Sequence, residues 1–214
     1  MGQQARSKET RERLLLAAAE LIQRNGYVNT SLADVARAVE MTKGAVYFHF
    51  ESKEVLALAL IDEQHRISRD AATEILTVDR PALQQMMLLC ADLARRLMND
   101  PIVQAGIKLT TDSTTFASPI REPYRDWLAT FEMLSTLALQ AGDITRDIPA
   151  TTLANFIIPA FTGVQLVSDT LADRDDLYER VRDMWRILIY ALTLENSRDD
   201  WLRIVDEIFS VRSR

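Results

Sequence analysis

The sequence predicts an all-α protein in which a small three-helix head precedes a larger helical body. Apolar residues recur at intervals of three and four along most segments, which is the spacing of one face of a helix. The 214 residues include only 6 Gly and 6 Pro, fewer than a fold with many strands and tight turns would need. No segment shows the alternation of apolar and polar residues that marks a half-buried strand, so helices are expected throughout.

The first two helices of the head are predicted from their end signals. A helix is expected over 7–25, because Ser7 can cap its start and Gly26, a common helix-stop residue, follows its end. A second, short helix should follow Thr30 or Ser31, since the hydroxyl of either residue can accept a hydrogen bond from the first free amides.

The third and fourth helices follow a tight turn at 40–42. Thr42 can cap a helix over 43–49, and Ser52 can cap a long helix that runs from Lys53 to about residue 76. Two short helices joined by a tight turn form a helix-turn-helix unit, whose second helix can enter the major groove of DNA. A helix-turn-helix head is therefore predicted at 1–52, and an all-helical body at 53–214.

Proline, glycine and polar clusters divide the body into further helices. Loops are expected at 111–123 and 142–149, where Thr, Ser, Pro and Gly gather. The expected body helices beyond the fourth cover 81–99, 101–110, 124–141, 149–172, 174–195 and 198–209.

Composition and charge restrict the class of protein. The net charge of −6 argues against a protein that coats nucleic acid nonspecifically. Residues 1–53, however, hold eight Lys or Arg and six Asp or Glu, so a positive head precedes an acidic body, which suggests a local anionic partner. The polar start does not resemble a signal peptide, and no purely apolar run is long enough to span a bilayer. We therefore expect a cytoplasmic protein without a membrane partner.

The stretch TKGAVYFHF has side chains suited to duplex DNA. Lys43 and the first amides of its helix favour a phosphate or a guanine edge, and the hydroxyl of Thr42 could bond a phosphate. Small residues at 44 and 45 would let the backbone approach closely, while a phenol and an imidazole can bond phosphate oxygens. Phe48 is expected to pack in the core. The predicted DNA contacts are Thr42, Lys43, Gly44, Ala45, Tyr47 and His49.

The stretch from about residue 7 to residue 62 resembles the N-terminal domain of TetR-family transcriptional regulators. The resemblance rests on the succession of a helix, then G-Y, T-S-L-ADVA, T-KGA-Y-HF and SKE-L. It implies a homodimer that binds a palindromic, double-stranded operator through the helix at 43–49. It also implies that the same stretch supplies the DNA contacts above, with Lys53 near the phosphates.

Parts of the body resemble the γ-butyrolactone-type signalling receptors of actinobacteria. The matching stretches are KGAVYFHF, RDW at 125–127 and FTGVQLVSDTL at 161–171. The resemblance implies a small apolar lactone, butenolide or furan ligand, with Trp127 lining its pocket. The alternative is that Trp127 is an ordinary core tryptophan. A small-molecule site between bundle helices, mostly apolar, fits the pocket interpretation.

The other predicted ligand contacts are a few polar and apolar side chains. Thr162 lies in an apolar helix, where its hydroxyl needs either a backbone carbonyl one turn earlier or a ligand. The resemblance places Gln64 near the ligand, although a solvated glutamine is the alternative. Pro159 should kink or open its helix. The apolar wall is expected to include Leu88, Leu109, Phe161 and Leu166.

Two long apolar helices in the C-terminal half, at about 150–172 and 175–195, are expected to supply a two-fold interface. They carry more apolar residues than one bundle needs, so part of this set should form a four-helix bundle between two subunits. The residues concerned are Phe156, Val164, Val167, Leu171, Val181, Trp185, Leu188 and Leu192, some of which must be core.

Other functions have weaker support. No cofactor, metal or catalytic site is expected, because His49 and His65 are the only histidines, Cys90 lies in an apolar pattern and no common catalytic motif appears. The positive head argues against a helical adaptor that binds protein alone. A related regulator that responds to antibiotics or multiple drugs stays open, because pocket volume is not readable from sequence.

Overall fold

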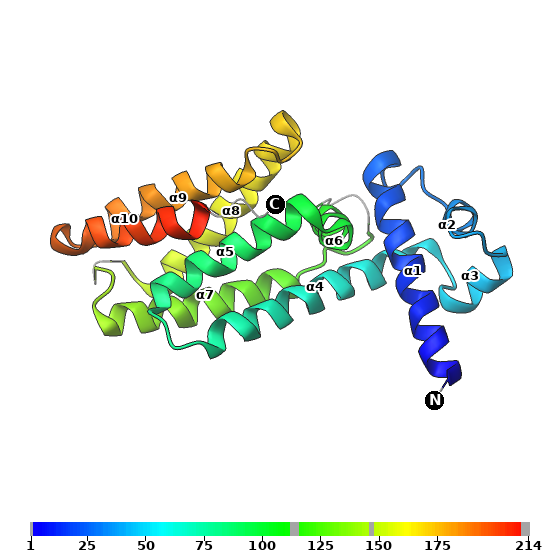
Figure 1. Ribbon diagram of the computed structural model, residues 1–214, viewed down its shortest axis with the longest axis horizontal. Coiled ribbons are helices and arrows are strands. Elements are labelled where there is room, and N and C mark those ends of the chain that lie inside the picture. Colours follow the sequence, from blue (N-terminus) through cyan, green and yellow to red (C-terminus); the bar gives the residue numbers. More distant parts are fainter. Residues whose placement is uncertain (1, 112–115, 146–147, 211–214) are drawn as a thin grey trace. The chain divides into compact units, whose positions relative to one another are not determined.

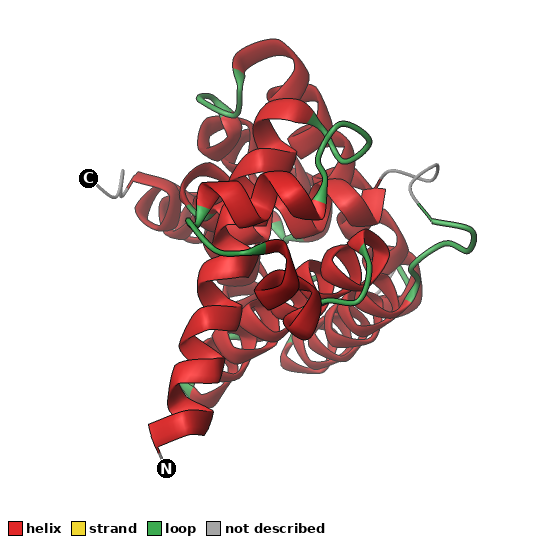
Figure 2. Ribbon diagram, turned by 90° about the vertical axis from the view of Figure 1, so that its right-hand side faces the viewer, coloured by secondary structure: helices red, strands yellow, loops and turns green. Residues whose placement is uncertain are grey.

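The computed structural model describes residues 2–111, 116–145 and 148–210, and within these ranges every regular element is a helix (Figures 1 and 2). The prediction of an all-α fold with a helix-turn-helix head is confirmed. The helices are α1 (Gly2–Asn25), α2 (Leu32–Ala38), α3 (Lys43–His49), α4 (Lys53–Thr77), α5 (Ala82–Asn99), α6 (Pro101–Thr111), α7 (Glu122–Ala141), α8 (Ala150–Ala172), α9 (Leu177–Leu192) and α10 (Glu195–Ser210).

Hydroxyl caps start three of the four N-terminal helices. Ser31 caps α2 in a reciprocal capping box with Asp34. The Thr42 hydroxyl accepts a hydrogen bond from the backbone amide of Ala45 at 3.3 Å, and the Ser52 hydroxyl accepts one from the first turn of α4 at 3.1 Å. Each cap satisfies an amide that has no partner within its helix, which confirms the predicted starts of α2, α3 and α4.

Several predicted helix ends are wrong. Ser7 lies inside α1, which begins five residues earlier, and Ser197 lies inside α10. The helix predicted from 174 begins instead at Leu177, because Asp173 and Arg174 take left-handed backbone angles (φ 47° and 68°) that end α8. A serine inside a helix can therefore be mistaken for an N-terminal cap when only the sequence is known.

The two predicted loops lie partly outside the described residues, at 112–115 and 146–147. In the described part, α7 begins at Glu122, two residues before its expected start. It ends as predicted at Gly142, whose φ of 79° is the left-handed angle favoured by a glycine cap.

The chain divides into two compact units. Unit 1 comprises Met1–Arg69 and Asn99–Ile120, and unit 2 comprises Asp70–Met98 and Arg121–Arg214. Helix α4 begins in unit 1 and ends in unit 2. The two units are defined by packing. The boundary predicted at residue 52 separates a DNA-binding part from a ligand-binding part by function, and it stays a prediction.

Unit 1 has one apolar core to which α1, α2, α3, the first half of α4, and α6 contribute. Helix α6 packs on α1, so a segment far along the chain completes the core of the helix-turn-helix head. This core includes Leu14, Leu15, Ile22, Val35, Val46, Phe50, Leu56, Leu60 and Leu109.

Unit 2 is a bundle in which α8 packs on both α7 and α9, and α10 packs on α9 (Figure 1). Helix α8 is long and apolar enough to cross a membrane by length and composition, but it is a component of this bundle, with Ile157 and Phe161 buried. Pro159 lies inside α8, as predicted. The core includes Leu83, Met86, Phe131, Leu134, Ile157, Val181, Trp185 and Ile189.

Candidate DNA-binding face and ligand site

The outward face of α3 holds most of the predicted DNA contacts. Val46 is fully buried and fixes which side of this short helix faces the core. Lys43 and Gly44 are exposed, Tyr47 is about half exposed, and Ala45 and His49 are partly buried at the edges of the face. The face therefore presents an ammonium group, a phenol and a position without a side chain close together.

The capping hydroxyl of Thr42 is still free to donate. It accepts from the amide of Ala45, which occupies an oxygen lone pair and leaves the hydroxyl proton for an outside acceptor such as a phosphate oxygen. The predicted contact from Thr42 is thus compatible with its role as a cap.

Lys53 has partners within the chain. Its ammonium nitrogen donates to the carbonyl of Val28 at 2.9 Å and lies 4.3 Å from the centroid of the Tyr27 ring. Burial lowers the pKa of this ammonium group. These contacts join α4 to the loop before α2, so Lys53 stabilises the head whether or not it also approaches a phosphate.

Phe48 contradicts the expectation that it packs in the core. Its side chain is 83% exposed, and its ring meets the neighbouring His49 ring edge-on at 5.4 Å between centroids. The sequence pattern misled because aromatic residues on short helices are usually buried, whereas here Val46 and Phe50 occupy the inward positions.

Gln64, a predicted ligand contact in unit 1, has a side-chain oxygen without a hydrogen-bond donor among the described residues. It is fully buried, which excludes the alternative of a solvated glutamine. Its amide nitrogen donates to Ser68 at 2.8 Å, but nothing in the described part of the chain donates to its carbonyl oxygen. An unpaired buried acceptor costs about 1–3 kcal/mol, so a donor from water or from a ligand would stabilise this oxygen.

The packing around Gln64 is tight. A Cβ added at Gly106 of α6 would lie 2.4 Å from Cβ of Gln64 and 3.1 Å from the carbonyl oxygen of Leu60. Only glycine fits at that crossing of α4 and α6. Leu109, one turn further along α6, lies in the core of unit 1, so packing there accounts for it without a ligand.

Trp127 is placed on the inward side of α7 in unit 2. It is partly buried, and its ring lies 5.8 Å from the ring of the fully buried Phe131, one turn along the helix. Part of this large ring stays accessible, so a ligand could pack against it.

The hydroxyl of Thr162 bonds a backbone carbonyl one turn earlier, which was the predicted alternative to a ligand. It donates to the carbonyl of Ile158 at 2.9 Å, one turn earlier in α8. It also forms a hydrogen bond with the hydroxyl of Tyr124 on α7, one turn before Trp127. Burial raises the pKa of Tyr124, and this hydrogen bond partly opposes that rise. Sequence reasoning missed Tyr124, because only the fold brings it to Thr162.

The three remaining wall residues differ in burial. Phe161 is buried and Leu88 is partly buried, both within unit 2. Leu166 is 43% exposed and lies beside the exposed Val167 on α8. Its exposure fits an outward face of the bundle better than a closed wall.

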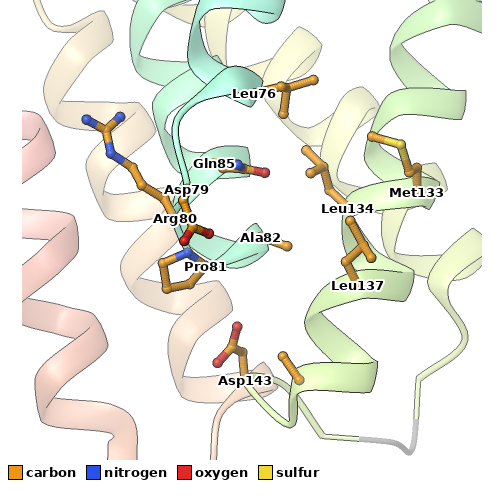
Figure 3. A pocket seen from close by; sticks show the side chains of 11 residues that line it. Leu76, Asp79, Arg80, Pro81, Ala82, Gln85, Met133, Leu134, Leu137 and Asp143 are labelled. Carbon is orange, nitrogen blue, oxygen red and sulfur yellow. The ribbon is translucent and has the colours of Figure 1, made fainter.

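An open cleft of about 660 Å³ in unit 2 contains none of these residues. Figure 3 shows Met133, Leu134 and Leu137 on one wall, Gln85 pointing inward from the other, and Asp143 at one end. Burial raises the pKa of Asp143. The cleft is thus mainly apolar with a few polar groups.

The apolar set predicted for a two-fold interface separates into two groups. Val181, Trp185, Leu188 and Leu192 of α9 are buried within the chain and are core. Phe156, Val167 and Leu171 of α8 are exposed, and Val164 is partly buried. Helix α9 and the turn after it also expose Ile187, Tyr190 and Leu194, which were not among the predicted residues. A helix wheel that marked the buried side of α9 would have found them.

Comparison with known proteins agrees with the fold and with a helix-turn-helix head. Residues 14–60 match the model described as bacterial regulatory proteins, tetR family, and residues 80–193 match the tetracyclin repressor-like C-terminal domain. The A-factor receptor protein of Streptomyces griseus is 31% identical over 192 residues, which cover 90% of this chain and 67% of that relative.

Two solved structures have the same fold. A γ-butyrolactone receptor described as ArpA-like has a TM-score of 0.84 at 28% identity, covering 96% of this chain and 98% of that one. CprB of Streptomyces coelicolor, studied in complex with its biological operator sequence, has a TM-score of 0.81 at 28% identity over the same shares.

The helical body and the helix-turn-helix head define a bacterial transcription regulator. The chain belongs to the TetR family, and it is similar to the γ-butyrolactone receptors within that family.

Proposed function

We propose that this protein is a ligand-responsive repressor that binds a palindromic operator as a homodimer and is released by a small apolar signal of the γ-butyrolactone, butenolide or furan type. The observation that carries the ligand response is the buried, unpaired carbonyl oxygen of Gln64. Because Gln64 lies on α4, the helix that continues directly from the head, a donor on a ligand would act on the element that carries α3.

The proposed operator contacts are Thr42, Lys43, Gly44, Ala45, Tyr47 and His49, with Lys53 nearby. The exposed face of α3 supports them, as does the similarity to CprB, which binds an operator. The exposed apolar face of α8 and α9 supports a dimer. Two heads so joined would read half-sites roughly 34–36 Å apart, which is one turn of DNA.

The proposed ligand contacts fall in two groups, one in each compact unit. Gln64 belongs to unit 1, with Leu109 as a weaker candidate. Trp127, Tyr124 and Thr162 belong to unit 2, with Phe161, Leu88 and Leu166 predicted to add apolar contacts. The similarity to the A-factor receptor supports a lactone-type signal.

Operator release tests the ligand proposal. A labelled duplex, selected from a random library with the purified protein, is titrated with a γ-butyrolactone, a butenolide and a furan. The parent should lose operator affinity by about 5- to 150-fold at saturation, the usual range of allosteric coupling. Trp127→Ala should bind DNA as the parent does but fail to respond, and Tyr124→Phe should respond only at higher ligand concentration.

The alternative function is that of a TetR-family regulator which responds to antibiotics or multiple drugs. The open cleft favours it, because apolar walls with Asp143 at one end suit a lipophilic cation. In that case the same titration would show operator release by lipophilic cations and none by the lactone series. Asp143→Asn would then reduce the release caused by the cations.

A further inference from the structure

Phe48 has no packing role that explains its position. It is 83% exposed on a short helix whose inward positions are filled by Val46, and the edge of the His49 ring holds its ring in place. A single exposed apolar side chain needs no explanation by itself, but this one lies on the face proposed above to meet the operator.

Gly44 lies one turn before Phe48 on the same side of α3. A Cβ added at Gly44 would meet nothing within 4 Å outside its own helix turn, and its φ is not positive. Glycine inside a helix is less favourable than alanine by about 1 kcal/mol, so neither the fold nor the backbone angle requires it here. A glycine at this position leaves room for a body that approaches α3 from outside.

The neighbours of this pair identify that body. Lys43 and Tyr47 flank them with an ammonium group and a phenol, both accessible, in a head of net positive charge. An ammonium group and a phenol beside an exposed ring, in a head of net positive charge, suit the phosphates and base edges of duplex DNA. Among the base edges of the major groove, the group that an uncharged ring contacts favourably is the C5 methyl of thymine.

We propose that Phe48 reads a thymine methyl group in each operator half-site, and that Gly44 supplies the room for this approach. The proposal rests on the operator-binding function proposed above and adds a specificity-determining residue to it. It corrects the expectation that Phe48 is a core residue.

Replacing thymine by deoxyuridine in the selected duplex, one symmetric pair at a time, tests the proposal, because it deletes the methyl group and leaves base pairing intact. One such pair should weaken the parent about fourfold per half-site, the equivalent of about 0.8 kcal/mol for a buried methyl-sized group. Phe48→Ala should bind thymine and deoxyuridine duplexes equally. Phe48→Leu should keep part of the discrimination.

Two controls separate this role from a structural one. Tyr47→Phe should lower affinity for both duplexes and keep the parent's ratio. Gly44→Ala should melt at the same or a higher temperature than the parent, yet bind the operator more weakly.

Each result decides between two claims. If Phe48→Ala and Phe48→Leu keep the parent's thymine-to-deoxyuridine ratio, or if no thymine matters to the parent, Phe48 does not read a methyl group while the repressor function stands. If Phe48→Ala instead changes the assembly state and not the ratio, its ring meets protein. If no duplex can be selected with the parent, the proposed function itself fails.

Discussion

At the residue scale, Lys43 is the side chain on which operator binding should depend most. It stands at the first turn of α3, exposed and flanked by Gly44. Lys43→Ala should weaken operator binding by about 1–3 kcal/mol and reduce the salt dependence of the affinity, because a base or phosphate contact is lost. Fluorescence anisotropy over a salt series measures both, and an unchanged affinity at every salt concentration would contradict the docking of α3.

Gly106 is the residue whose substitution should most clearly damage folding without touching DNA. Gly106→Ala would drive its Cβ to 2.4 Å from Gln64, so α4 and α6 must separate at a cost of about 1–3 kcal/mol. Thermal melting followed by circular dichroism should show a lower midpoint. Gly163→Ala, whose Cβ would meet nothing within 4 Å, is the matched control and should melt no earlier than the parent.

Cys90 should be inert in the folded protein. It is almost fully buried, and burial raises the pKa of its thiol to about 12, so the reactive thiolate is scarce near neutral pH. An Ellman-type thiol reagent at pH 8 should modify less than a tenth of the protein until denaturant is added, by the same reasoning. Rapid modification of the native protein would show that α5 opens locally.

At the element scale, α9 carries a direct contrast between core and surface. Ile187 is 71% exposed and its neighbour Leu188 is 5% exposed. Ile187→Asp should yield a folded monomer, because a charge in an apolar two-fold face lacks a partner, whereas Leu188→Asp should unfold the chain. Sedimentation velocity and circular dichroism measure the two effects. A stable dimer of Ile187→Asp would place the interface elsewhere.

The ends of elements show where sequence prediction succeeds and why it stops. Ser31, Thr42 and Gly142 mark ends correctly, because a cap or a left-handed glycine is a local device. Ser7 and Ser197 lie inside helices, since a hydroxyl signals a cap only where the helix actually begins. Local chemistry cannot show how far a helix continues beyond such a residue.

The site shows the same division between local and long-range information. The α3 residues share one short segment, so their common face is readable from spacing. Tyr124 and Thr162 lie on two consecutive helices and meet only through the packing of α7 on α8. The burial of Gln64 likewise depends on Gly106 of α6, which no local pattern of α4 indicates.

At the scale of the whole molecule, α4 connects the two parts of the proposed mechanism. Its first turn is tied to the head through Lys53, and its middle holds the unpaired oxygen of Gln64. A ligand can shift operator affinity only through different affinities for the DNA-bound and released states. In the proposed mechanism, a ligand that bonds Gln64 would act on α4, the helix that follows α3 in the chain.

The most direct test of this central claim measures how a ligand releases the Gln64→Leu variant from the operator. The substitution keeps the side chain's approximate volume and removes the unpaired oxygen, but it also removes the hydrogen bond to the buried Ser68, at a cost of about 1–3 kcal/mol of stability. Circular dichroism checks that the variant is folded, and the folded variant should bind the selected operator duplex like the parent. The account predicts that the γ-butyrolactone, butenolide or furan that releases the parent leaves Gln64→Leu on the DNA at the same concentration. Release of both proteins at equal ligand concentration would contradict a ligand contact at Gln64.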